Sequence, residues 1–195
     1  NNLMMKKIIY TLVLLISYSS FSQINIEKPE GWFDMNTSNS IAENLKRVQV
    51  NDQVIEEALN DLEIKQSVTL YFFTKYDLSK YAGVSPTINA TLLRNINGYS
   101  LEDLKSQGEL MMNQYKSMGM EEVSLEGNDY VNLKSGKKAL ELKSTFKLPA
   151  RPEKVISTVY LYFISEDREW YIQLALSGLE NDKCDDIFKV LIENL

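Results

Sequence analysis

The residues that could do chemistry in this chain are acids, lysines and tyrosines, because the sequence contains no histidine and only one cysteine. Without histidine, a Ser-His-Asp or Cys-His catalytic arrangement, a histidine-ligated zinc site and an imidazole pH switch are all excluded. The single thiol, Cys184, can form neither an internal disulfide nor a thiolate metal site alone. Its neighbours are mostly acidic, whereas a reactive cysteine needs an electropositive setting. We therefore interpret Cys184 as a small residue on a helix face.

Two pairs of adjacent acids, Glu121–Glu122 and Glu166–Asp167, could in principle act as general acid and base. Both pairs adjoin predicted turns, where exposed acids are common, and the sequence carries neither a nucleophile motif nor a glycine-rich phosphate loop. The acids Asp182, Asp185 and Asp186 lack the alternating ligand positions of an EF-hand, so we interpret them as helix-capping residues rather than as a calcium site. The sequence therefore predicts a protein that is not an enzyme and that holds no metal and no cofactor.

A long connecting segment, Asp77–Pro86, is the first candidate binding surface. It joins two predicted strands but is too long for a tight hairpin. Loops that are carried by a rigid scaffold are frequent sites of function. We therefore predict that Tyr76, Tyr81 and Gly83 contribute to a binding site.

A group of lysines beside the predicted two-residue turn Ser135–Gly136 is the second candidate surface. Such a group could dock an anionic lipid headgroup or polymer, although lysines at a hairpin also protect sheet edges. The chain as a whole has a net charge of -6 at pH 7, so it lacks the basic footprint of a nucleic-acid-binding protein and no nucleic-acid partner is expected. The lysines are Lys134, Lys137 and Lys138, with Lys143 further along the next strand.

A hydrophobic pocket is a third possibility. Aromatic residues alternate along the predicted strands and could line a pocket between sheet and helix, with hydroxyl groups as polar handles. The alternative is that they belong to an ordinary core. These residues are Tyr71, Phe73, Tyr160, Tyr162 and Tyr171.

The N-terminal stretch has the pattern of a secretory signal peptide. A basic start precedes an apolar run at residues 8–16, and small residues at Ser20 and Ser22 fit a cleavage site. The apolar run is shorter than the ~20 residues that span a bilayer. We predict that residues 1–22 are a signal peptide and that the protein is exported to the periplasm or outside the cell. Residues 23–195 are expected to form one monomeric domain with no stable membrane span.

Hydrophobic periodicity predicts an α+β fold. The run Val68–Tyr76 is apolar on both alternating faces, as expected for a strand that is covered on both sides. Apolar residues at a spacing of three and four predict one long helix over Ser100–Met118, ended by Gly119, and a final helix capped by Asn181 or Asp182. Two short helices are predicted within residues 40–62. Further strands are predicted at residues 32–33, 87–92, 123–125, 130–133, 137–148, 155–164 and 169–177.

The connections between the predicted strands are mostly short. We therefore expect one twisted antiparallel sheet of about six strands, with helices covering both faces in an α-β-α sandwich.

The order of elements and three short motifs resemble the PsbP-like superfamily. The motifs are Pro29–Trp32 after the signal peptide, Lys75–Asp77 at the end of the central strand and Ser85–Asn89 at the start of the next strand. The resemblance covers residues 24–195 and implies the α-β-α sandwich that this superfamily shares with a Ran-binding nuclear import factor, as well as small secreted bacterial relatives. It carries no catalytic signature, so it implies a non-enzymatic role. The photosystem members bind through basic, histidine-bearing surfaces that this chain does not have, and that role is not transferred.

These patterns together predict a secreted, non-enzymatic binding or accessory protein of the cell envelope, whose partner is an envelope protein or polymer. A carrier of a hydrophobic small molecule is the alternative, and a hydrolase that uses Asp or Glu is a third interpretation.

Overall fold

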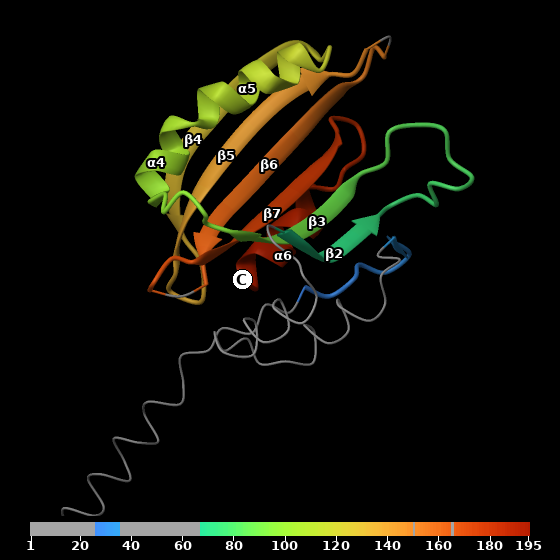
Figure 1. Ribbon diagram of the computed structural model, residues 1–195. Coiled ribbons are helices and arrows are strands. Elements are labelled where there is room, and N and C mark those ends of the chain that lie inside the picture. Colours follow the sequence, from blue (N-terminus) through green and yellow to red (C-terminus); the bar gives the residue numbers. More distant parts are fainter. Residues whose placement is uncertain (1–25, 36–66, 150, 165) are drawn as a thin grey trace, which may run out of the picture.

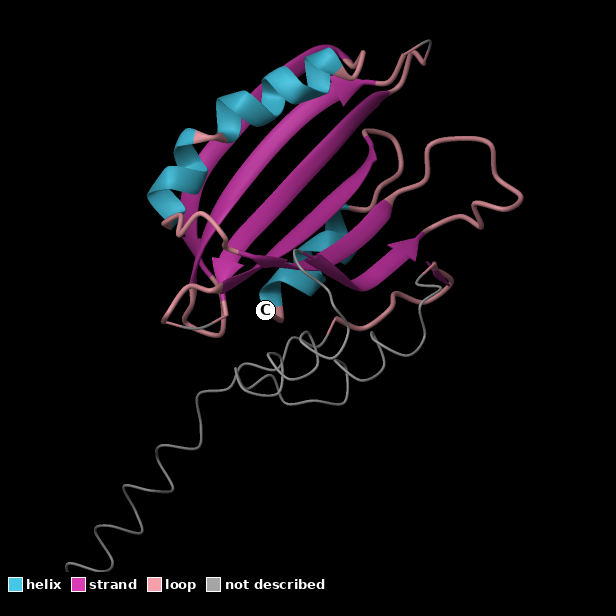
Figure 2. Ribbon diagram, in the orientation of Figure 1, coloured by secondary structure: helices cyan, strands magenta, loops and turns pink. Residues whose placement is uncertain are grey.

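The structure is a computed structural model that describes residues 26–35, 67–149, 151–164 and 166–195. The described residues form one antiparallel sheet in the strand order β1-β2-β3-β7-β6-β5-β4, accompanied by three helices (Figures 1 and 2). The strands are β1 (Phe33–Asp34), β2 (Ser67–Thr74), β3 (Thr87–Arg94), β4 (Glu121–Asn132), β5 (Lys138–Lys147), β6 (Lys154–Phe163) and β7 (Trp170–Leu179). The helices are α4 (Leu101–Ser106), α5 (Gly108–Ser117) and α6 (Asp185–Glu193). The predicted signal peptide and the predicted short helices lie outside the described residues.

The predicted α+β class and the antiparallel sheet are confirmed, but the expected strand count is wrong. The described part of the chain has seven strands rather than about six. The predicted strands at residues 123–125 and 130–133 are one long strand, β4, which pairs with β5 through two irregularities of register. Because β-bulges let a strand absorb extra residues and continue, short breaks in the alternating pattern did not end it.

Alternate residues of the central strands enter two separate cores, because successive side chains of a strand point to opposite faces. On one face, Ile88 and Leu92 of β3 and Leu174 of β7 are fully or almost fully buried, and they belong to a core onto which α6 packs. On the other face, Leu104 of α4 packs with buried residues of β5 and β6 such as Leu140. Helix α6 therefore lies on the opposite face of the sheet from α4 and α5.

Strand β2 departs from the predicted alternation at Leu70. Val68 pairs with Leu92, whereas Tyr71 pairs with Ala90, so Leu70 is the extra residue of a β-bulge. As a result Val68 and Tyr71 both face the α6 core. They are three residues apart, so a strictly alternating strand would place them on opposite faces. The prediction of two strictly alternating faces is wrong at this point.

The predicted long helix is divided into α4 and α5 at Gln107. The backbone N–H of Gln107 donates to Leu104 O and Lys105 O, which ends the first helix. Gly108 then opens the second helix where the chain comes close to β4: a Cβ atom at this glycine would lie 3.1 Å from Asn128 Nδ2. The predicted stop at Gly119 is in place, and this glycine has a φ of +85°.

Two predicted turns and caps differ in the structure. The β4–β5 connection has a three-residue loop, Lys134–Gly136, instead of a two-residue turn: Leu133 N–H donates to Lys137 O, and Gly136 takes the left-handed conformation that such loops require (φ +81°). Helix α6 begins after Cys184, not after Asn181 or Asp182, and no side chain caps it. The Asp182 carboxylate instead accepts a hydrogen bond from Leu179 N–H (3.1 Å), so it faces back toward β7.

Candidate functional site

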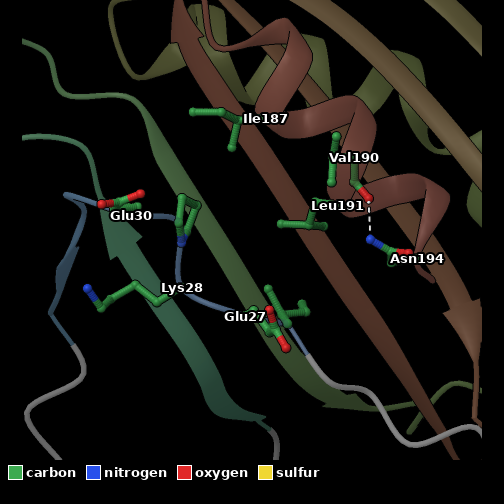
Figure 3. A pocket seen from close by; sticks show the side chains of 9 residues that line it. Glu27, Lys28, Glu30, Ile187, Val190, Leu191 and Asn194 are labelled. Atoms are coloured by element: carbon green, nitrogen blue, oxygen red, sulfur yellow. Dashed lines mark hydrogen bonds between the residues drawn. The ribbon is translucent and has the colours of Figure 1, made fainter.

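A groove between the N-terminal described segment and α6 is the candidate functional site (Figure 3). Its volume is about 550 Å³, which is within the range of ligand-binding pockets, about 300–1,000 Å³. One wall comes from residues 26–30 and the other from α6. The lining residues are Ile26, Glu27, Lys28, Pro29, Glu30, Ile187, Val190, Leu191 and Asn194.

The α6 wall of the groove follows from the spacing of apolar residues on the helix. Ile187, Val190 and Leu191 recur at intervals of three and four, so they share one side of α6. Leu191 also packs against the α6 core, while the Val190 side chain remains 58 % exposed. An apolar side chain that stays this exposed beside a groove gives the groove an apolar wall.

The opposite wall is held in place by contacts between the N-terminal segment and the core. Trp32 is buried, and its ring meets the ring of Phe188 on α6 edge to face, with centroids 6.3 Å apart. Pro29 O accepts a hydrogen bond from Trp32 N–H (3.1 Å), which closes the turn that carries the wall. Ile26 is also buried, and it joins the same core.

The N-terminal side of the groove is charged, in contrast to the α6 wall. Glu27, Lys28 and Glu30 are exposed on one side, and Asn194 stands on the other. Lys28 Nζ donates a hydrogen bond to Trp32 O at 2.7 Å, so part of the hydrogen-bonding capacity of this ammonium group is taken up within the protein. Such a site can bury an apolar group in its interior while the polar end of a ligand remains in water at the rim.

The predicted loop site lies elsewhere, at the end of β2. The rings of Tyr76 and Tyr81 are in contact, with centroids 4.4 Å apart, and Gly83 lies against the Tyr81 ring. Tyr76 O–H donates to Asp182 Oδ1 at 3.2 Å. Burial, together with the negative charge of Asp182, raises the pKa of the Tyr76 hydroxyl. Arg151 Nη2 donates to Ala82 O (2.8 Å) and attaches the same loop to the β5–β6 connection.

The predicted lysines lie at the opposite end of the sheet from this loop, so the structure does not bring the two groups together. Lys134 is exposed on the β4–β5 turn, Lys137 Nζ donates to Ile164 O (2.7 Å), and Lys138 Nζ lies 3.8 Å from the centre of the Tyr130 ring. A hydrogen bond from Tyr130 to Glu102 raises the pKa of that tyrosine to about 12. The binding roles of Lys134, Lys137 and Lys138, like those of Tyr76, Tyr81 and Gly83, stay predictions.

The predicted aromatic pocket is wrong in one respect, because the five aromatic residues do not share a face. Tyr71, Phe73, Tyr160 and Tyr162 belong to the α6 core, whereas Tyr171 packs on the opposite face, where its ring meets Phe163 with centroids 6.0 Å apart. The first four are buried, with exposed fractions of 5 % or less. They fill the core, and the groove is lined by other residues.

The groove residues were not predicted from the sequence as a site. Residues 26–30 and α6 lie near opposite ends of the chain, and no periodicity relates them. One signal was present: Val190 is an apolar residue of the predicted final helix, and it is exposed on the helix surface. An apolar residue on the exposed side of such a helix marks a surface that can be covered by something else.

Within the described part of the chain, no group of three or more His, Cys, Asp or Glu side chains is placed to hold a metal ion. None of the described helices is long and apolar enough to cross a membrane.

No protein-family model and no curated protein matches this chain. Among solved structures, the chain is similar to LpqN, described as involved in cell envelope biogenesis of Mycobacterium tuberculosis. The sequences are 10 % identical, the match covers 87 % of this chain and 79 % of that chain, and the TM-score is 0.46. A similarity of this size supports no conclusion about ligand or role. The resemblance to the PsbP-like superfamily therefore stays a prediction.

Proposed function

We propose that this protein is an exported, non-enzymatic binding protein of the cell envelope, and that its groove receives the apolar part of an envelope component. The observation that carries the proposal is the groove itself: apolar side chains of Ile187, Val190 and Leu191 line its α6 side, and charged residues of the N-terminal segment stand on the other side. Export rests on the signal-peptide pattern of residues 1–22. The absence of histidine and of a nucleophile motif in the sequence supports a role in binding rather than in catalysis.

A hydrophobic small molecule is the ligand class that this geometry favours. The groove has the volume of a small-molecule site, and burying apolar surface gives roughly 25 cal/mol for each Å² removed from water. The rim acids Glu27 and Glu30 repel an anionic headgroup, so the polar end of the ligand should be neutral or cationic. This joins the two leading interpretations of the sequence, an envelope accessory protein and a carrier of a hydrophobic molecule.

The test uses the uncharged hydrophobic dye N-phenyl-1-naphthylamine, whose fluorescence rises in apolar surroundings. The variant Val190→Gln places a polar side chain in the groove, and Lys189→Gln, its neighbour on α6, is the matched control. Both residues are exposed, so both variants should fold. We expect Val190→Gln to weaken dye binding about fivefold or more, since it replaces apolar contact by an amide that must be desolvated.

Lys189→Gln should bind the dye as the natural chain does. Equal binding by all three proteins would overturn the groove as the site. Native mass spectrometry of the protein purified without detergent gives a second measurement, because a bound apolar molecule adds a mass that Val190→Gln should lose.

A further inference from the structure

The N-terminal side of the groove carries two acids that have no partner among the described residues. Glu27 and Glu30 both line the groove and are exposed, and neither carboxylate makes a hydrogen bond or an ion pair with another described residue. Lys28 also lines the groove, but its Nζ donates to Trp32 O at 2.7 Å, and its side chain extends away from α6 (Figure 3). Two acids against one engaged cation leave this side of the groove with a net negative charge.

The C-terminal end of α6 adds a second source of negative potential. The groove lies along the later part of this helix, from Ile187 to Asn194. The carbonyl groups at a helix C-terminus carry a partial negative charge, equivalent to roughly half an elementary charge. A basic residue in the last turn would offset this charge, but α6 has none there. The negative end of the helix is therefore directed toward the same groove without a compensating cation of its own.

The remaining polar residues of α6 beside the groove do not reverse this balance. Asn194 Nδ2 donates to Val190 O at 2.9 Å, so the amide uses an N–H group within the helix, and its Oδ1 remains as an acceptor at the groove. Lys189 Nζ lies 3.9 Å from Glu193 Oε1, so the charges of these two exposed residues offset one another. Both sides of the groove therefore present negative potential or hydrogen-bond acceptors beside apolar side chains.

This charge distribution discriminates between the polar ends that an apolar ligand can carry. An anionic end meets two carboxylates and a helix end of its own sign, and a neutral end gains no attraction between charges. A cationic end meets opposite charge from Glu27, Glu30 and the end of α6. Because the two acids are exposed, the cation also keeps much of its hydration, and an exposed ion pair of this kind strengthens an interaction about 1.4- to 5-fold.

We propose that the ligand of the groove is a cationic amphiphile, an apolar chain that ends in an ammonium group. The chain lies against Ile187, Val190 and Leu191, and the ammonium group faces Glu27 and Glu30. This inference rests on the function proposed for the groove, and it adds the charge of the polar end. It thereby decides between the neutral and cationic ligands that the apolar wall alone would accept.

The test compares three ligands that share a decyl chain: decyltrimethylammonium, the net-neutral decyldimethylamine N-oxide and the anionic decyl sulfate. Each is titrated at neutral pH, below the concentration at which it forms micelles, into the whole protein with bound N-phenyl-1-naphthylamine, and the loss of fluorescence measures displacement of the dye. We expect decyltrimethylammonium to bind about tenfold more tightly than the amine oxide, because two ion pairs of about threefold each act together. Decyl sulfate should bind most weakly, and added salt should reduce the preference for the cation because it screens exposed charges.

The preference for the cationic over the neutral ligand is the quantity to follow in variants, because a change that only alters the shape of the groove affects both dissociation constants. Glu27→Gln and Glu30→Gln should each lower this preference about threefold, and the double variant should remove most of it. Glu109→Gln makes the same chemical change at an exposed position of α5, on the opposite face of the sheet, and should keep the preference. Asn194→Lys adds a basic residue at the C-terminal end of α6, which favours the helix, and it should lower the preference as well.

The experiment separates two kinds of failure. If the dye binds and Val190→Gln weakens its binding, but decyltrimethylammonium binds no more tightly than the amine oxide, the cationic ligand is refuted and the groove stays an apolar site. The cationic ligand is also refuted if the preference survives in the double variant of Glu27 and Glu30. If neither the dye nor any of the three ligands binds, or if Val190→Gln binds them all as the natural chain does, the function proposed for the groove fails and this inference fails with it.

Discussion

Asp182 connects the β2–β3 loop to the turn that leads into α6, and its removal is the sharpest test of how that loop is held. Its carboxylate accepts hydrogen bonds from Leu179 N–H (3.1 Å) and Tyr76 O–H (3.2 Å). Its backbone oxygen accepts a third from Lys75 Nζ (2.8 Å), and the same ammonium lies 4.0 Å from Oδ1. The side chain of Asp182 is only 11 % exposed.

The substitution Asp182→Ala removes the two carboxylate hydrogen bonds but leaves the bond from Lys75 to the backbone. A hydrogen bond to a charged group contributes about 1.5–3 kcal/mol. Removing a partly buried carboxylate also removes its cost of desolvation, which offsets part of the loss. The ion pair with Lys75 adds little, because the lysine side chain is 30 % exposed and the distance is long. We expect the free energy of unfolding to fall by about 2–3 kcal/mol.

Urea unfolding followed by tryptophan fluorescence measures this change, since both Trp32 and Trp170 are buried. The matched control is Asp185→Ala on the first turn of α6, where the exposed acid acts mainly on the helix dipole and should contribute less than about 1 kcal/mol. If Asp182→Ala costs no more than Asp185→Ala, the contacts of Asp182 do not hold the loop and the reasoning is refuted.

Three further substitutions test local contacts. Gly83→Ala places a Cβ atom 2.4 Å from Cζ of Tyr81, so the exposed ring should swing away from its aromatic neighbour at a cost of about 1 kcal/mol in urea unfolding. Tyr160→Phe removes the hydrogen bond that Glu141 accepts at 2.6 Å and should cost about 1–2 kcal/mol at pH 7. Burial and this hydrogen bond raise the pKa of Tyr160, so the difference from the natural chain should be constant below pH ~10 and shrink as the pH rises toward the folded-state pKa. Ser100→Ala removes the capping box of α4 and should lower stability by about 1 kcal/mol.

Each of these expectations can fail in a defined way. If Gly83→Ala costs as much in a Tyr81→Ala background, the ring is not what the new methyl group displaces. If the effect of Tyr160→Phe grows above pH 10, the sign assigned to its pKa shift is wrong. Ser106→Ala is the control for Ser100→Ala, because Ser106 only donates to a backbone oxygen within the same helix, and an equal loss from both would argue against the capping role.

The strands were predictable wherever burial follows a strict alternation. The predicted strand at residues 169–177 alternates apolar and other residues, and its apolar residues Trp170, Ile172, Leu174 and Leu176 are all buried in the α6 core. Such a pattern is local, because the face of each residue depends only on the parity of its position.

Register and helix breaks were not predictable, because they depend on partners that are distant in sequence. The bulge at Leu70 follows from pairing with β3, and both sides of β2 are apolar there, so the change of face leaves no sign in the pattern of apolar residues. The break at Gln107 coincides with the close approach of Gly108 to Asn128 on β4. A glycine within a helical pattern signals a possible close contact, but not with which element.

The candidate surfaces show the same contrast: the β2–β3 loop was predictable from the sequence, and the groove was not. The β2–β3 loop was predicted from its length, and the structure shows how local and long-range hydrogen bonds give it a defined shape: Lys75 N–H donates to Pro86 O, and Tyr76 N–H donates to Ser85 Oγ. The groove was not predicted, because its walls come together only when the N-terminal segment packs on α6 through Trp32.

The sheet separates two cores, because alternate residues of its central strands serve different faces. Leu174 packs in the α6 core, and its neighbour Gln173 points to the opposite face of the sheet. A ligand in the groove contacts Ile26 and Leu191, which also pack in the α6 core, whereas the odd-numbered residues of β3 and β7 point to the other side of the sheet. Substitutions at distant sites without shared partners act additively. Coupling between the groove and the opposite face would therefore require the sheet itself to change register or twist, and the nearly complete burial of Ile88, Ile172 and Leu174 opposes such a change because a close-packed interior resists deformation.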